Sequence, residues 1–306
     1  MNDNILSYIV DPKDNYVYLR DVMKTHLKLS HSLLTRLKQQ NKIRVNGQVS
    51  FTNYLLQAGD EVTVDIGLEE ENTIEPEYMP LDIVYEDPDL LVINKPPSLA
   101  VHPVKGISGG TLANAVTYYW AQQGQTTIFR PINRLDKNTS GLILIGKSQY
   151  AHQAIFRQQK QGTISRKYQA LVEGLVQEDS GCINLPISHP DPRLCARTVD
   201  PSGKPSVTTY QVLHRFKGYT LLSLTLGTGR THQIRVHLSQ AGHPICGDTL
   251  YGSPSSLIDR QALHAGQLTL EQPRTGARLQ FETPLPEDML RMIVGHGDSQ
   301  NNSKRI

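Results

Sequence analysis

The sequence predicts an α+β protein in which a small α/β domain precedes a larger domain built on a mixed, largely antiparallel β-sheet. Short apolar or alternating runs, typical of strands, recur along the chain with a few helical segments between them. An acidic, proline-containing segment at residues 69–80 divides these elements into two groups. We therefore expect domains at residues 16–68 and 81–292, joined by this linker, and flexible ends at residues 1–15 and 293–306.

The N-terminal domain is predicted to combine a helix with a small β-unit. Ser30 is a candidate N-cap for a helix reaching Gln40, and leucines 33, 34 and 37 fall on one face of that helix. Residues 43–47 (Ile-Arg-Val-Asn-Gly) alternate and end in a turn pair, and residues 62–66 (Val-Thr-Val-Asp-Ile) alternate again. A helix followed by short strands is the expected order.

The larger domain is predicted to contain more strands than helices. We expect strands at 90–93, 142–145 and 164–172, and a strand pair at 207–216 and 219–226 around Lys217-Gly218. A helix capped by Ser148 should run to about Lys160 and stop at Gly162, and residues 231–241 should form another helix. This mixture favours antiparallel pairing.

Composition excludes several classes of protein. No apolar run approaches the roughly 20 residues that span a bilayer, and residues 1–4 (Met-Asn-Asp-Asn) do not resemble a signal peptide, so we expect a cytoplasmic protein without a membrane partner. Three cysteines, Cys182, Cys195 and Cys246, are too few for a disulfide framework or a Cys-rich zinc site. Neither a nucleotide-binding glycine loop nor a Gly-x-Ser-x-Gly elbow occurs, and nothing in the sequence demands more than a monomer.

Charge is segregated along the sequence although the net charge is only +2. Residues 13–44 carry eight basic residues against two acids, whereas residues 69–89 carry nine acids and no basic residue. Residues 90–172 carry ten basic residues and one acid, Asp136, and residues 201–247 carry five basic residues and no acid. Three basic stretches together favour a partner rich in phosphate, such as RNA, over a merely solvated surface.

Asp136 stands out because it is a lone carboxylate between Arg134 and Lys137. Nearby positive charge favours the ionised form, and a fixed carboxylate is a competent nucleophile or ion stabiliser at a sugar carbon. A structural Arg-Asp ion pair or an Asx-turn explains the same residues, so these residues by themselves leave both interpretations open.

The wider sequence resembles the RluA family of pseudouridine synthases. Residues 129–142 (Phe-Arg-Pro-Ile-Asn-Arg-Leu-Asp-Lys-Asn-Thr-Ser-Gly-Leu) resemble the catalytic motif of this family. The family's opening motif is matched before it at residues 91–103, further motifs follow in the family's order at residues 166–174 and 229–237, and Gly242 to Gly252 completes the series. The resemblance spans nearly all of residues 81–289 and implies a catalytic domain of the pseudouridine synthase type.

The resemblance implies an isomerisation of uridine in RNA that needs no metal, nucleotide or other cofactor. By resemblance, Asp136 is the nucleophile or proton-transfer carboxylate, Tyr168 lies against the base and helps to remove the C5 proton, and Arg235 pairs with Asp136. Arg134 would help to hold the extruded nucleotide. The further candidate RNA contacts in this domain are Lys95, Asn133, Lys137 and Arg230.

One residue departs from the family pattern. Asn133 stands where the family commonly has histidine before Arg-Leu-Asp. An amide can donate and accept hydrogen bonds but cannot titrate. We expect this position to orient the loop, because Asp136 and the residues after it are intact.

Residues 16–66 resemble the S4 RNA-binding domain, in their order of helix and strands and in their Ala-Gly-Asp-Glu-Val-Thr-Val segment at 58–64. Such domains use the basic face of their helices on structured RNA. The resemblance makes five residues candidate phosphate contacts: Lys28, Arg36, Lys38, Lys42 and Arg44. An S4 domain beside this catalytic domain favours large-subunit (23S) ribosomal RNA as substrate, with transfer RNA as the alternative.

Three other functions compete with this interpretation. A glycoside or nucleoside hydrolase generally needs two carboxylates, whereas the catalytic stretch offers one. His232, His237, His243 and Cys246 lie close in sequence, but the spacing of His232 and His237 does not put both on one helical face, so we expect no metal site. A non-catalytic S4-type RNA-binding protein would leave the motifs around Asp136, Tyr168 and Arg235 unexplained.

Overall fold

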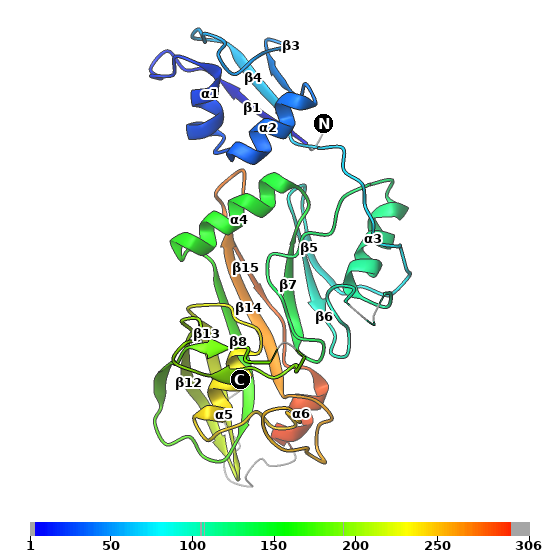
Figure 1. Cartoon of the computed structure of the whole chain (residues 1–306), viewed down its shortest axis with the longest axis vertical. Helices are drawn as coiled ribbons and strands as arrows, with labels where there is room; N and C mark the ends of the chain where they lie inside the picture. Colours follow the sequence, from blue (N-terminus) through cyan, green and yellow to red (C-terminus); the bar gives the residue numbers. More distant parts are fainter. Residues whose placement is uncertain (1–3, 105, 107, 192, 295–306) are drawn as a thin grey trace.

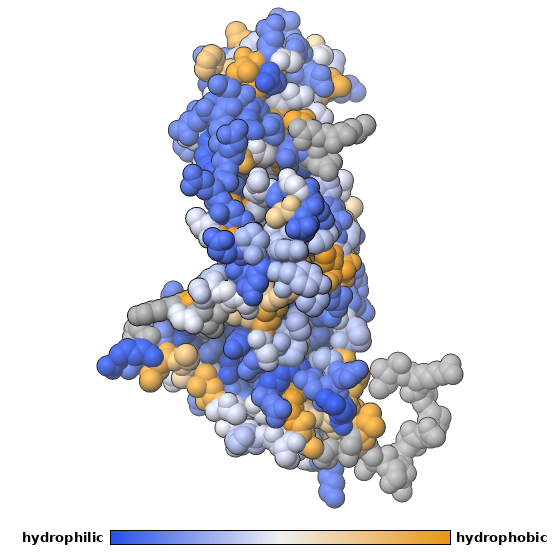
Figure 2. Space-filling view, turned by 90° about the vertical axis from the view of Figure 1, so that its right-hand side faces the viewer, coloured by the Kyte–Doolittle hydropathy of each residue, from blue (hydrophilic) through white to orange (hydrophobic). Residues whose placement is uncertain are grey.

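The computed structural model describes residues 4–104, 106, 108–191 and 193–294. It forms an elongated molecule with a small N-terminal domain at one end and a larger sheet domain below it (Figure 1). No helix in the described part of the chain is long and apolar enough to cross a membrane. The face in Figure 2 is mostly hydrophilic, with apolar residues in separate small groups.

The N-terminal domain is a four-stranded antiparallel sheet, ordered β1-β4-β2-β3, with helices packed on one side. Its strands and helices are β1 (Ile5–Ile9), α1 (Leu19–Asp21), the π-helical turn η1 (Val22–His26), α2 (His31–Gln39), β2 (Ile43–Val45), β3 (Gln48–Val49) and β4 (Glu61–Asp65). Ser30 caps α2 by accepting a hydrogen bond from the Leu33 amide, and the three leucines of α2 lie in the domain core as predicted.

The expectation of a flexible segment over residues 1–15 is wrong for Ile5–Ile9. This segment forms β1, which pairs with β4 along its whole length because Leu6 enters the domain core and the backbone completes the sheet edge. Its apolar residues do not alternate cleanly, so the sequence pattern does not indicate a strand here. Residues 1–3 lie outside the described residues.

Residues 69–80 contain no helix or strand, but hydrogen bonds hold the segment along α3 (Leu112–Gln122). Asn72 donates to the Thr117 hydroxyl, and Asn114 donates to the carbonyl of Glu75 at 2.8 Å. Glu70 pairs with Arg36 of the N-terminal domain at 2.7 Å and also with Arg130 of the larger domain. The acidic charge of this segment therefore joins the two domains, and it does not simply extend the chain by repulsion.

The larger domain is built on one nine-stranded sheet. Its path is β5-β6-β7-β14-β8-β13-β12-β9, with β15 paired to β14. Among the strand pairs of this sheet in the described residues, only β7 and β14 run parallel, so the expected mixed, largely antiparallel sheet is present. The strands are β5 (Ile83–Glu86), β6 (Leu90–Lys95), β7 (Ser140–Gly146), β8 (Ser165–Glu173), β9 (Ser180–Asn184), β12 (Val207–Phe216), β13 (Tyr219–Leu226), β14 (Leu263–Glu271) and β15 (Arg278–Glu282).

Helices cover both faces of this sheet. On one face, α4 (Gln149–Gln161) packs Ala151 and Ile155 against β6, β7 and β14. On the other face lie α3, α5 (Gln233–Gln240) and α6 (Glu287–Val294), in the largest apolar core. A separate pair of short strands, β10 (Ile187–Ser188) and β11 (Thr198–Val199), lies in the chain segment that connects β9 to β12.

Several predicted boundaries in this domain are confirmed. Helix α4 begins after the Ser148 cap and ends at Gly162, whose φ of 71° is easily reached by glycine. The strand pair β12 and β13 has the predicted bounds. The predicted helix at 231–241 is shorter, because His232 takes a left-handed conformation (φ 57°) and α5 starts at Gln233. The flexible tail expected from residue 293 is wrong for Ile293 and Val294, which belong to α6, and the residues after Val294 lie outside the described residues.

The parallel contact of β7 with β14 depends on a glycine. Gly141 has φ of 111°, and a Cβ atom there would lie 2.3 Å from the carbonyl oxygen of Ala265. A side chain would push the two strands apart, so only glycine permits this register. The loop that carries Asp136 enters the sheet at this point, and the glycine therefore fixes where that loop ends.

Candidate active site

Asp136 lies in the loop between α3 and β7, at the centre of the larger sheet. Leu135 is buried in the apolar core beside it, and the Thr139 amide closes a turn on the Asp136 carbonyl at 3.0 Å. The side chain of Asp136 is 25% exposed. Leu135 thus anchors the loop in the core, and the carboxylate of Asp136 faces a pocket.

Four side chains fix the backbone of this loop. The Lys95 ammonium donates to the carbonyl of Lys137 at 3.0 Å, and Arg260 donates to the carbonyl of Asn138 at 3.2 Å. Gln261 donates to the Thr139 hydroxyl, and the Asn133 amide accepts from Leu144 N at 2.8 Å. Because the backbone is fixed on both sides of Asp136, the position of its carboxylate is predetermined.

Arg235 on α5 pairs with Asp136, as the resemblance implied. Its Nη1 donates to Asp136 Oδ2 at 3.0 Å, while Nε and Nη2 donate to both oxygens of Asp248 at 2.7 and 2.8 Å. Burial by itself lowers the pKa of Arg235, but the hydrogen bonds and charges of Asp248 and Asp136 outweigh it, so the net pKa is raised. The guanidinium is therefore a permanent cation aimed at the Asp136 carboxylate.

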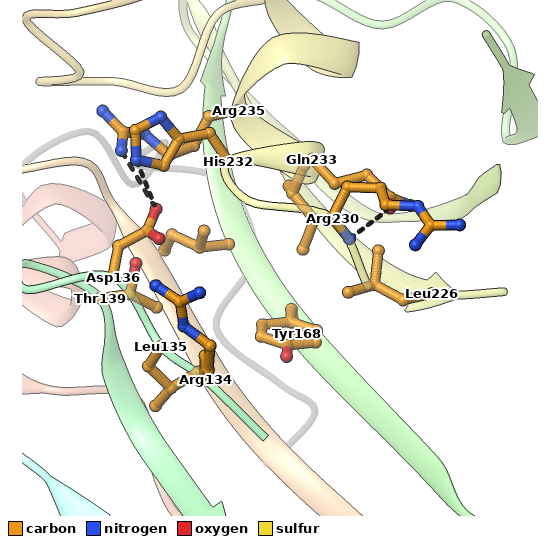
Figure 3. A pocket seen from close by; sticks show the side chains of 12 residues that line it. Arg134, Leu135, Asp136, Thr139, Tyr168, Leu226, Arg230, His232, Gln233 and Arg235 are labelled. Carbon is orange, nitrogen blue, oxygen red and sulfur yellow. Dashed lines mark hydrogen bonds and ion pairs between the residues drawn. The ribbon is translucent and has the colours of Figure 1, made fainter. Parts of the chain in front are cut away.

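His232 contacts Asp136 from the same side as Arg235 (Figure 3). Its Nε2 lies 3.8 Å from Asp136 Oδ2, and its Nδ1 shares a hydrogen bond with the Tyr251 hydroxyl at 2.9 Å. Burial lowers the pKa of His232, and the nearby guanidinium of Arg235 lowers it further, while Asp136 opposes the change. The neutral imidazole is thus the favoured form near pH 7.

Tyr168 forms another wall of this pocket. The residue is 5% exposed and comes from β8, the strand next to β14. Burial raises the pKa of its phenol, with a smaller opposing effect from Arg166. Arg134, Tyr168 and Arg235 line one pocket together with Asp136, which is the only carboxylate among the lining residues in the described chain.

Sequence and structure comparisons assign the family. Residues 89–240 match the family model described as RNA pseudouridylate synthase. The chain is 44% identical over 260 residues to the uncharacterized RNA pseudouridine synthase YlyB of Bacillus subtilis (strain 168), covering 83% of this chain and 86% of that protein. The chain belongs to the RNA pseudouridine synthase family. The synthase is therefore an isomerase that acts on RNA.

Two further relatives support the assignment. The synthase is 38% identical over 276 residues to ribosomal large subunit pseudouridine synthase D of Vibrio parahaemolyticus, covering 84% of this chain and 85% of that protein. The solved structure of human RNA pseudouridylate synthase domain containing 1 superposes with a TM-score of 0.56 at 29% identity, covering 71% of this chain and 86% of that one. The sheet domain thus has the pseudouridine synthase fold.

Two of the candidate RNA contacts of the synthase are wrong as surface contacts. Lys95 has no exposed surface, and its ammonium donates to the carbonyls of Pro96, Leu99 and Lys137. Burial lowers the pKa of Lys95 to about 7, with Arg260 acting in the same direction and Asp136 opposing. Asn133 is also buried, and its amide bridges Leu142 O and Leu144 N. Both residues support the catalytic loop and do not face solvent.

The remaining candidates divide into exposed and paired cations. Arg36 and Lys42 are paired with Glu70 and Asp65, at 2.7 and 2.8 Å, so their charges are largely compensated. The other candidates are exposed to solvent: Lys28, Lys38 and Arg44 on the N-terminal domain, and Arg134, Lys137 and Arg230 around the pocket.

The histidines and cysteine considered for zinc have separate partners in the synthase. His237 shares hydrogen bonds with the Thr208 hydroxyl and the Leu185 carbonyl, and His243 bonds the Glu173 carbonyl. Burial raises the pKa of the Cys246 thiol to about 12. The described residues contain no group of three ligands that could hold a metal ion.

Sequence reasoning missed the roles of His232, Asp248 and Tyr251. All three belong to the motifs at residues 229–237 and 242–252, and that membership was the only available signal. In the fold, they surround Arg235 and hold its guanidinium in place beside Asp136.

Proposed function

We propose that this synthase isomerises a uridine of large-subunit (23S) ribosomal RNA to pseudouridine, with Asp136 as the essential carboxylate. One observation carries the proposal: the only carboxylate lining the described pocket is fixed by a buried arginine beside a tyrosine ring. The reaction breaks the C1′-N1 bond, turns the uracil within the site and joins C5 to the ribose, so no atom is gained or lost.

The two oxygens of Asp136 have different surroundings. Oδ2 accepts the hydrogen bond from Arg235 and faces His232, whereas Oδ1 accepts no hydrogen bond from the described residues. This arrangement leaves Oδ1 for the target nucleotide. Held this way, the carboxylate serves as nucleophile or proton carrier without first having to move, which is the advantage of preorganisation.

Tyr168 and Arg134 suit the handling of an extruded base. The raised pKa of Tyr168 keeps its phenol protonated near pH 7, so the aromatic ring rather than a phenolate meets the uracil. Any proton removal from C5 by Tyr168 then requires the phenol to pass on its own proton. Arg134 is exposed at the pocket rim, where its side chain can hold the extruded nucleotide.

The preference for ribosomal RNA rests on relatives and on the N-terminal domain. Several relatives at 36–38% identity carry the name ribosomal large subunit pseudouridine synthase D. The S4-like domain presents Lys28, Lys38 and Arg44 at its surface, and ion pairs join it to the larger domain through Glu70. A second basic surface joined to the catalytic domain is suited to a large structured RNA.

Hydrolysis is disfavoured by the position of the second carboxylate. Asp248 has a fully buried side chain, and both of its oxygens are engaged by Arg235. It does not line the pocket and has no access to an attacking water. The usual pair of facing carboxylates of a glycosidase is therefore lacking among the described residues of this pocket.

The direct test is a pseudouridine map. Unmodified large-subunit rRNA and transfer RNA transcripts are incubated with the protein, and pseudouridines are located by chemical labelling and primer extension. We expect one or a few sites in the ribosomal RNA, and none with Asp136→Asn. Modification of transfer RNA alone would overturn the substrate, whereas full turnover by Asp136→Asn would remove Asp136 from the mechanism.

A further inference from the structure

A second pocket adjoins the active site and has no part in the contacts described so far. It lies between the loop before α5 (residues 227–231) and an arm that includes β10 and β11, formed by residues 185–191 and 193–205. Its volume is about 470 Å³. We call it the arm pocket. Arg230 lines both pockets, so the two are direct neighbours.

The arm pocket is lined by three cations: Arg197, Lys204 and Arg230. None of them pairs with a carboxylate in the described part of the chain. The Arg197 guanidinium donates only to the carbonyls of Cys195 and Ala196, and Arg230 Nε donates only to the Pro205 carbonyl at 3.4 Å. No Asp or Glu is among the lining residues.

Several other arginines of the described chain are paired with acids. Arg193, on the same arm, pairs with Asp191 at 2.8 Å, and Arg260 and Arg274 pair with Asp288 and Asp89. Three uncompensated cations around one concave surface repel one another. Such a cluster is favourable when an anion occupies the space between its members.

The backbone beneath these cations is fixed. The Lys204 amide and carbonyl both pair with Ile187 of β10, at 2.8 and 2.9 Å. A Cβ at Gly203 would lie 2.5 Å from the Ile187 backbone, so this turn needs glycine to approach the strand. The nearby carboxylate of Asp200 accepts hydrogen bonds from Ser202 within the turn and does not line the pocket.

The arm is also linked to Asp136. The Arg197 amide donates to the Tyr251 hydroxyl at 2.6 Å, and the same hydroxyl bonds His232, which faces Asp136. Figure 3 shows the Arg230 guanidinium directed away from Asp136, at the far edge of the active-site pocket. These contacts therefore fix the position of the arm pocket relative to the site where the target nucleotide enters.

We propose that the arm pocket binds a phosphate group of the RNA strand next to the target uridine. This inference rests on the proposed function and adds the residues that hold the flanking backbone. Two guanidinium groups and an ammonium around one space match the oxygens of a phosphodiester. Contacts to the flanking backbone offset the free energy needed to extrude the uridine from its stack.

The test compares single charge removals on the same arm. Lys204→Gln and Arg197→Gln each remove an uncompensated cation, whereas Arg193→Gln removes the same formal charge from a residue outside the arm pocket. We expect the first two to raise the KM for an rRNA transcript about tenfold, the effect of one charge-assisted hydrogen bond, with kcat nearly unchanged. Lys204→Arg should restore most of the loss.

Direct binding separates this inference from the proposed function. Filter binding of the same transcript, measured over a range of salt concentration, needs no turnover. We expect Lys204→Gln to reduce the salt slope by about 0.7 to 0.9, the value for one lost phosphate contact, and Arg193→Gln to leave it unchanged. If Lys204→Gln, Arg197→Gln and Arg193→Gln all have the same KM and the same salt slope, the proposed phosphate site is wrong even if the wild type modifies the RNA.

A free anion is the competing ligand. Titration calorimetry with inorganic phosphate alone should give no measurable heat with the wild type, because a single free anion lacks the rest of the RNA contact. Tight phosphate binding that is lost in Lys204→Gln, together with an unchanged KM for RNA, would assign the pocket to a small anion and overturn the proposal. Wild type without activity on any ribosomal RNA, but with the expected salt slopes, would instead overturn the proposed substrate reaction.

Discussion

The guanidinium of Arg235 is held by the buried carboxylate of Asp248 through two hydrogen bonds, at 2.7 and 2.8 Å. Asp248 also accepts from the amides of Leu250 and Tyr251, so it is fixed by its own loop. The carboxylate therefore sets the direction in which the third nitrogen of Arg235 reaches Asp136. Removal of Asp248 should harm both the fold and the chemistry.

We expect Asp248→Asn to lower the free energy of unfolding by about 3–5 kcal/mol, because a buried ion pair loses one partner and leaves the other charged. If the variant folds, kcat should fall more than KM rises, since Arg235 is no longer aimed at Asp136. Urea unfolding and single-turnover rates measure the two effects. A double variant with Arg235→Gln should lose less than the sum of the single losses. Strict additivity of the two losses would argue against coupling.

His232 is expected to affect the pH dependence of the rate. Because burial lowers its pKa, the imidazole is neutral near pH 7 and becomes a cation only as the pH falls. That cation, 3.8 Å from Asp136 Oδ2, would compete with substrate for the carboxylate. The wild-type kcat should therefore decline on acidification more steeply than the kcat of His232→Gln.

At pH 8 the kcat values of the wild type and His232→Gln should lie within about tenfold of each other. The amide of glutamine can still bond the Tyr251 hydroxyl, so the variant loses about the free energy of one hydrogen bond. The measurement is kcat between pH 5 and 8.5 under saturating RNA. Superimposable pH profiles would exclude this role for His232.

Asn133 tests whether the position before Arg134 orients the loop or takes part in proton transfer. Its buried amide bonds the backbone of Leu142 and Leu144. Asn133→Ala should lower the free energy of unfolding by about 1–3 kcal/mol, because it leaves the Leu144 amide without a partner. Asn133→His, the residue commonly found in the family, should keep activity and add no new feature to the pH profile. A new ionisation in the rate of Asn133→His would show that this position can act in proton transfer.

The sequence predicted those elements of the synthase in which periodicity and local signals agree. Helix α4 has a serine cap, a glycine stop and an amphipathic face, and β12 and β13 flank a Lys-Gly turn. Helix α3 was not predicted, since almost every residue in its first turns is buried and no polar face marks the helical period. Strand β14 was also not predicted, because its first four residues are all buried and no alternation marks the strand there.

In the candidate site, the sequence predicted the side chains but not what surrounds them. Asp136, Tyr168 and Arg235 converge as the family resemblance implied. Lys95 and Asn133 were expected to touch RNA, because a lysine or an asparagine in a basic stretch gives no sign of burial. Long-range partners such as Asp248 for Arg235 depend on how β8, β14 and α5 pack, and sequence spacing does not encode that packing.

His264 should make the stability of the fold depend on pH. It lies on β14, almost fully buried, and its Nδ1 shares a hydrogen bond with the Ser140 hydroxyl of β7 at 2.9 Å. Burial lowers the pKa of His264 from 6.5 to about 4; Arg260 acts in the same direction, and the Thr283 carbonyl and Asp288 oppose it. Between these two values the unfolded chain binds a proton that the folded chain does not. Stability is therefore fully present above pH 6.5 and is lost as the pH falls toward 4.

We expect His264 to account for a loss on the order of 3 kcal/mol in the free energy of unfolding across that window. Urea unfolding at several pH values between 4 and 7.5 measures it. His264→Gln, which can still bond Ser140, should flatten the decline, whereas His214→Gln, a change at an exposed histidine of β12, should leave it as in the wild type. If His264→Gln and the wild type lose stability in parallel on acidification, His264 is not the titrating group, and the carboxylates of paired residues such as Asp288 must carry the acid sensitivity of the fold.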